Sequence, residues 1–147
     1  MRFLPFILGL VCAAAVGCST ASVRQSTAPQ SSGTLSGSDE ALARAFEQRA
    51  RNLRVEGQGI VKKVLSDDNA GSRHQRIVVA LASGQTLLIA HNIDLAPRVI
   101  GLHEGDAVSF SGEYEWNPEG GVIHWTHRDP NKRHPAGWIK HNGKVYQ

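Results

Sequence analysis

The stretch VSFSGEYEW, residues 108–116, alternates apolar and polar side chains more regularly than any other part of the chain. Its large apolar side chains all fall on even-numbered positions: Val108, Phe110, Tyr114 and Trp116. Serine or glutamate fills every odd-numbered position, and Gly112 is the one even-numbered position without a large side chain. Because side chains of a β-strand point alternately to opposite faces, this stretch predicts a strand with one face in a core and the other toward solvent.

Two further strand patterns follow this stretch. The turn-forming sequence NPEGG at 117–121 precedes an alternating segment at 122–127. The segment 138–146 is divided by Asn142-Gly143, two residues that tolerate the positive φ of a two-residue hairpin turn. We therefore expect a fifth main strand and a C-terminal hairpin.

Three strand patterns precede the same stretch. They cover residues 55–65, 74–81 and 86–91, and short polar segments that favour chain reversal separate them. Residues 92–102 form a longer connection with room for a short helix. Together with the downstream segments this gives five main strands and no alternation of strands with helices.

That pattern predicts an all-β fold, a small Greek-key barrel of the OB type over residues 55–147. A short sandwich is the alternative. Residues 39–54 predict a short helix before the barrel, with Ser38 as its N-cap and a narrow apolar face that packs on the domain.

The N-terminus has the features of an export signal. Arg2 precedes an apolar run that is too short to span a bilayer, which is typical of a signal peptide at 1–17. The sequence AVGC at 15–18 resembles a bacterial lipobox, which implies lipid attachment at Cys18; an ordinary secretory signal is the alternative. Residues 18–38 are rich in small polar side chains and predict a disordered tether.

Composition excludes several classes of protein. Among 147 residues, 16 Lys and Arg against 13 Asp and Glu give a net charge of only +3, so the chain is not strongly basic. If its two cysteines are used as predicted, Cys12 leaves with the signal peptide and Cys18 carries the lipid, so no thiol remains for catalysis. Neither a GxSxG motif nor a phosphate-binding glycine loop occurs. We therefore lean away from an enzyme.

Polar residues near the ends of the second and third strands suggest a ligand site. His74 and Arg76 belong to one strand, His91 ends the next, and Asn92 and Asp94 follow it. OB barrels commonly bind ligands on this face, and the planar guanidinium of Arg fits anions. Adding the nearby aromatic ring, the predicted ligand-binding set is His74, Arg76, His91, Asn92, Asp94 and Trp125.

The segment after residue 123 suggests a metal site instead. Its candidate ligands for zinc or another divalent transition metal are His124, His127, Asp129 and His134. On a regular strand His124 and His127 point to opposite faces, so both reach one ion only if the strand bends or ends between them. Glu115 is the base of the corresponding hydrolase hypothesis. The alternative is that these histidines cap strand ends and stack on Trp125.

Four segments resemble a bacterial family known as domain of unknown function 3465. They are SRHQR at 72–76, LLIAHNIDLAPR at 87–98, GEYEWNPEGGVIHWTH at 112–127 and GWIKHNGK at 137–144. The resemblance implies no activity, cofactor or partner.

These features lead to three hypotheses. The first is a lipoprotein on the periplasmic side of a bacterial membrane, with the outer membrane favoured and secretion as the alternative. Its OB-like module would bind an anionic ligand or an oligosaccharide, with nucleic acid less favoured. The second hypothesis is a metal-dependent hydrolase that uses the segment from His124 to His134. The third is a structural module that contacts another envelope protein.

Overall fold

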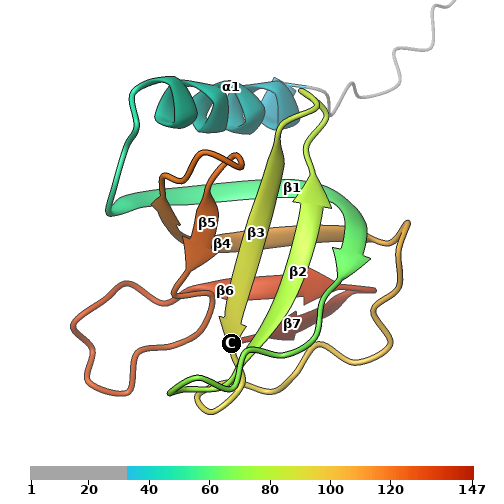
Figure 1. The fold of residues 1–147 in the computed structure, drawn as a ribbon, viewed down its shortest axis with the longest axis vertical. Helices are drawn as coiled ribbons and strands as arrows, with labels where there is room; N and C mark the ends of the chain where they lie inside the picture. The colour runs from blue at the N-terminus through green and yellow to red at the C-terminus, as the bar shows by residue number, and fades with distance from the viewer. Residues whose placement is uncertain (1–32) are drawn as a thin grey trace, which may run out of the picture.

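The computed structural model describes residues 33–147 (Figure 1). The predicted signal peptide, lipidated Cys18 and most of the tether lie outside the described residues. The described part contains one helix and seven strands: α1 (Gly33–Glu47), β1 (Leu53–Val64), β2 (His74–Ala80), β3 (Thr86–Asn92), β4 (Ala107–Glu115), β5 (Val122–His124), β6 (Trp138–His141) and β7 (Lys144–Tyr146). The predicted strands are confirmed, and their bounds differ by a few residues.

Five strands close a barrel in the order β1-β2-β3-β5-β4, and β1 pairs with β4 to complete it. The pairing of β3 with β5 is parallel, and the other pairings are antiparallel. β6 and β7 extend the sheet from β4 as a hairpin. This is the predicted OB-like barrel, and the sandwich alternative is wrong.

The long strand β1 closes the barrel because it pairs with two strands, β2 and β4. Ile60 pairs with Ala80 of β2 and also with Ala107 of β4, so the strand passes from one partner to the other at this residue. Beside it, a Cβ on Gly59 would lie 2.6 Å from the carbonyl oxygen of Ala80. Glycine therefore permits the close approach that the bend requires.

Strict alternation on β2, β3 and β5 separates a core face from an outer face. The inner side chains are almost fully buried: Ile77, Val79, Leu87, Ile89 and Ile123. The outer face carries His74 and Arg76 on β2, Ala90 and Asn92 on β3, and His124 on β5, all half-buried. The fold thus brings three segments of the predicted sites onto one surface.

The helix lies earlier in the chain than predicted. It spans Gly33–Glu47 in place of 39–54, so Ser38 lies inside the helix and is not its N-cap. Arg49 and Asn52 adopt positive φ values of 51° and 52°, which end the helix and turn the chain into β1. Leu42 and Ala45 are buried against the barrel, and Figure 1 shows α1 lying across one end of it. Within residues 33–147, no helix is long and apolar enough to cross a membrane.

β5 also ends earlier than the predicted 122–127. Its last residue is His124, because Trp125 has a φ of 53° and leaves the extended conformation. Residues 125–137 form a long loop that returns to β6. The connection between β3 and β4 consists of turns and contains no helix.

Candidate functional site

Two adjoining hollows lie on the outer face of β2, β3 and β5. They share His74, Ala90 and His124, so we treat them as one surface, called here the outer groove. The first hollow has a volume of about 210 Å³ and is completed by Asn92, Leu95, Trp125 and His127. The second has a volume of about 290 Å³ and is completed by Asp68, Arg76, Leu88 and Val122. Ala90 is common to both, and its small methyl group keeps them open to each other.

Two histidines that line both hollows have ring nitrogens without hydrogen-bond partners among the described residues. Among residues 33–147, no hydrogen-bond partner is found for the imidazole of His74 or His124. Burial lowers the pKa of His124 because it disfavours the charged form, and His74 adds repulsion. Glu115 and Glu113 oppose this effect. At neutral pH the imidazole of His124 is therefore uncharged, with one donor and one acceptor.

Arg76 and Asp68 provide opposite charges in the second hollow. Nε of Arg76 donates to the carbonyl oxygen of Ser66 at 2.8 Å, which orients the guanidinium. One oxygen of Asp68 accepts from the backbone N–H of Ala70 at 3.0 Å. Both groups thus have fixed positions and further hydrogen-bonding capacity.

His91 does not belong to the predicted ligand site, and that prediction is wrong. Its side chain is completely buried on the inner face of β3. Nδ1 lies 2.8 Å from Oγ1 of Thr126, and Nε2 lies 3.1 Å from the carbonyl oxygen of Pro97. Burial lowers its pKa. His91 therefore supports the groove from beneath.

The other two predicted residues of this region differ in position. Asn92 lines the groove, and its Oδ1 accepts from the backbone N–H of Asp94 at 2.9 Å, so its amide N–H groups stay available. Asp94 lies outside the groove and pairs with Arg73. Hydrogen bonds from the Arg73 backbone and side chain lower the pKa of Asp94.

Trp125 is held in place at one end of the groove. Its ring stacks on His134 with centroids 3.8 Å apart and planes inclined by 12°. Its centroid also lies 5.4 Å from that of His127. Nδ1 of His134 in turn lies 3.8 Å from a carboxylate oxygen of Glu113. The predicted ligand contact is thus structurally available, and the ring is oriented before any ligand binds.

The four predicted metal ligands are not brought together. Within the described residues, no group of three or more His, Cys, Asp or Glu side chains is arranged to hold a metal ion. His124 faces the groove, His134 stacks on Trp125, and Nδ1 of His127 donates to the Arg128 carbonyl oxygen at 2.8 Å. Asp129 accepts backbone N–H groups of Asn131, Arg133 and His134, and these hydrogen bonds lower its pKa.

Glu115 is not placed as the hydrolase hypothesis requires. Its carboxylate accepts from the backbone N–H of Asn52 at 2.8 Å and lies 3.8 Å from the guanidinium of Arg51. The residue paired with His124 across the strands is Glu113. Glu115 therefore secures the start of β1.

Sequence reasoning missed two residues that shape the site. Ala90 was not distinguished from other strand residues, although alternation places it on the outer face. Arg54 donates to the carbonyl oxygens of Pro135 and Ala136 and to Oγ of Ser111, and so clamps loop 125–137 to the barrel. No sequence signal marks that contact, because it joins residues far apart in the chain.

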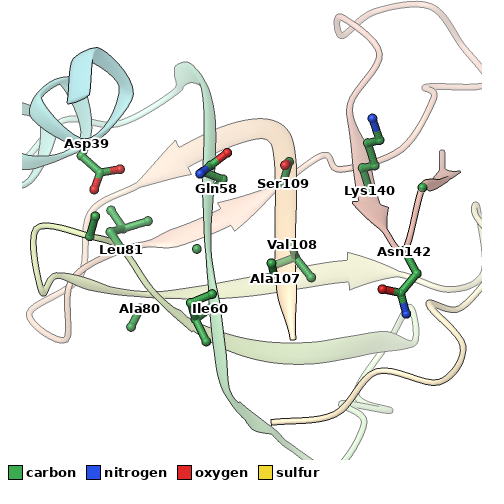
Figure 2. A pocket seen from close by; sticks show the side chains of 13 residues that line it. Asp39, Gln58, Ile60, Ala80, Leu81, Ala107, Val108, Ser109, Lys140 and Asn142 are labelled. Atoms are coloured by element: carbon green, nitrogen blue, oxygen red, sulfur yellow. The ribbon is translucent and has the colours of Figure 1, made fainter. Parts of the chain in front are cut away.

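A cavity larger than either hollow lies elsewhere, between β1, the end of β2 and the β6–β7 turn. It measures about 490 Å³, and Figure 2 shows Ile60 and Ala107 in its middle, with Asp39 on one side and Lys140 on the other. Its lining is mostly apolar, and Asp39 already accepts from the backbone N–H of Ser83. Polar side chains line this cavity too, but the outer groove adds two imidazoles, those of His74 and His124, that have no hydrogen-bond partner among residues 33–147, so the groove is the better candidate site.

Comparison with known proteins identifies a family for this chain. A family model described as "Protein of unknown function (DUF3465)" matches residues 26–147. No curated protein and no solved structure matches the chain.

Proposed function

The chain belongs to the DUF3465 family of proteins of unknown function, and from its outer groove we propose that it is a non-catalytic binding module. The module binds an anionic ligand or a carbohydrate through His74, Arg76 and His124, with Asn92 and Trp125 beside them. We further propose that it works in the bacterial cell envelope, held on the periplasmic side of a membrane by a lipid on Cys18.

One observation carries the binding proposal. Polar side chains from β2, β3 and β5 converge around Ala90, and the imidazoles of His74 and His124 have no hydrogen-bond partner among the described residues. Polar side chains that only stabilise a fold normally form hydrogen bonds with one another. Several polar side chains that point into one groove and lack hydrogen-bond partners therefore favour a ligand there. Each contributing strand belongs to the closed barrel, which gives the groove a rigid support.

The residues favour binding over hydrolysis. Asp129 and His127 form hydrogen bonds with the backbone of loop 125–137, and Glu115 caps the start of β1. The hydrolase hypothesis asks these same groups to hold a metal or accept a proton. In the part of the chain that the structure describes, no specific contact favours the third hypothesis, a structural module.

A binding experiment on the full chain tests the proposal. The probes are sodium pyrophosphate and tetraoses of glucose, mannose and N-acetylglucosamine, measured by isothermal titration calorimetry. We expect at least one probe to bind, and Ala90→Leu to abolish that binding by filling the groove. The matched control is Ala107→Leu, another outward strand alanine, which lines the cavity of Figure 2. If no probe binds, or if both variants bind like the parent, the groove is not the site.

A separate experiment tests the location. Expressed in a bacterial host, the parent chain should sediment with membranes, and Cys18→Ser should move it to the soluble envelope fraction. Cys12→Ser is the control, because the lipobox pattern ends at Cys18 and does not use Cys12. A Cys18→Ser protein that remains on membranes would rule out the lipid anchor.

A further inference from the structure

The charges around the outer groove balance one another. Arg76 and Asp68 line the same hollow, one positive and one negative. Next to the groove, Arg73 pairs with Asp94 at 2.7 Å. An anion entering this surface would meet one guanidinium together with a carboxylate. A neutral polar ligand avoids both that repulsion and the cost of stripping water from a charge.

The hydrogen-bonding groups in the groove are of mixed type. Arg76 and the amide of Asn92 offer donors, and Asp68 offers acceptors. His74 and His124 each carry one donor and one acceptor when uncharged, and burial keeps His124 in that form by lowering its pKa. A hydroxyl group both donates and accepts, so a ligand with several hydroxyls matches this set.

The groove also contains an aromatic and apolar surface. Trp125 lies at one end, with Leu95 beside it, while Leu88 and Val122 extend the apolar floor beyond Ala90. Stacking on His134 fixes the indole ring, so little side-chain entropy is lost when a ligand contacts it. A flat ring of this kind complements the C–H face of a pyranose sugar.

From these three observations we infer that the outer groove binds a neutral oligosaccharide. One sugar unit lies against Trp125, and the hydroxyl groups of the next unit meet His74, His124, Arg76 and Asp68. The two hollows share three residues and form one continuous surface. A ligand that fills both hollows therefore needs two consecutive sugar units, one in each. This inference rests on the proposed binding function and selects one of its two ligand classes.

The test uses the full chain and five probes at about pH 7.5, where free histidine is mostly uncharged. The neutral probes are the tetraoses of glucose, mannose and N-acetylglucosamine. Sodium pyrophosphate and octathymidylate represent the small anion and the single-stranded nucleic acid. Each is titrated by calorimetry, and amide chemical shifts locate the contact.

We expect at least one neutral tetraose to bind, with shifts at Ala90 and Trp125. Its affinity should be unchanged from about 50 to about 500 mM salt, whereas a phosphate ligand weakens over that range. Trp125→Leu should weaken binding about tenfold, equivalent to about 1.4 kcal/mol. Ala90→Leu should abolish it and Ala107→Leu should not. Thermal melts confirm folding, and Ala90→Leu, on an outer face, keeps the test valid if Trp125→Leu fails to fold.

The other outcomes overturn the inference in distinguishable ways. If pyrophosphate or octathymidylate binds in the groove and all three sugars are silent, the neutral-sugar inference fails but the groove remains a binding site. If a sugar binds and only Ala107→Leu blocks it, the site is the cavity of Figure 2. If none of the five probes binds, the inference and the proposed function both fail.

Discussion

Nδ1 of His91 and Oγ1 of Thr126 lie 2.8 Å apart in the fully buried layer beneath the outer groove. Nε2 of the same ring lies 3.1 Å from the Pro97 carbonyl oxygen, which can only accept a hydrogen bond. We therefore assign the ring proton to Nε2, so that Nδ1 accepts from the hydroxyl of Thr126. This contact ties β3 to the segment that leaves β5 and to the connection that follows β3.

The first prediction concerns stability in acid. Burial lowers the folded-state pKa of His91 below its ordinary value of 6.5, so below that pH the folded protein binds fewer protons than the unfolded chain. This contribution to stability is complete above about pH 6.5 and is lost as the pH falls through the folded-state pKa. The melting temperature should therefore fall between about pH 7.5 and pH 5. His91→Gln should flatten the fall and lower stability at neutral pH by about 1–3 kcal/mol.

The control for this prediction is His103→Gln, because the side chain of His103 is 79% exposed. It should keep the slope of the parent. His124, whose pKa burial also lowers, contributes with the same sign, so some slope should remain in His91→Gln. An unchanged slope in that variant would contradict the assignment of the acid response to His91.

The second prediction concerns the clamp on loop 125–137. Arg54→Lys keeps the charge but cannot reach all three acceptors, the oxygens of Ser111, Pro135 and Ala136. We expect faster amide hydrogen exchange in the loop and a loss of about 1–2 kcal/mol in the free energy of unfolding. Hydrogen exchange and urea denaturation measure the two effects.

Arg51→Lys is the matched control, because its guanidinium makes one exposed ion pair with Glu115. Its stability should stay within about 0.5 kcal/mol of the parent. Equal effects from the two substitutions would show that Arg54 does not clamp the loop.

The third prediction concerns Gly137, where the loop rejoins the sheet. A Cβ at this position would collide with the carbonyl oxygen of Trp125 and lie 2.6 Å from that of Ser111. Gly137→Ala should therefore cost about 3 kcal/mol or more, because backbone must move to admit the methyl group. At Gly37 in α1 a Cβ meets nothing within 4 Å, so Gly37→Ala should be neutral or stabilising by up to about 1 kcal/mol. Thermal melts that rank the two variants equally would refute the packing argument.

The fourth prediction concerns metals. Because no described group of three ligands is arranged around one point, tag-free full-length protein should contain no stoichiometric zinc or copper. A chelator should leave its melting temperature unchanged. Elemental analysis before and after chelation tests this, and bound metal that stabilises the protein would return attention to His124, His127 and His134.

Much of the fold could be predicted because alternation is a local property. The stretch at 108–116 revealed β4 directly, and Asn142-Gly143 marked the final hairpin, where both residues have positive φ. The position of α1 was harder to predict, since its burial depends on Leu42 meeting the barrel and not on capping by Ser38. A helix held by tertiary packing has weak signals at its own ends.

The site was predicted in part. The sequence correctly assigned His74 and Arg76 to one strand, but the inner position of His91, which alternation along β3 also implies, was not predicted. The positive φ of Trp125 could not be predicted, because left-handed backbone at a non-glycine residue depends on surrounding contacts. His124 and His127 line the same hollow after this turn, but Asp129 accepts backbone N–H groups of its own loop and His134 stacks on Trp125, so the four predicted metal ligands do not meet.

The placement of α1 before β1 has a mechanical consequence. Tension applied at the N-terminus reaches the barrel through this helix, whose buried side chains Leu42 and Ala45 cover one end of the core. Helix contacts would yield first, and the paired strands of the closed barrel would resist afterwards. The helix should therefore detach from the barrel at a lower force than the force that separates the strands, and extension should proceed in two steps.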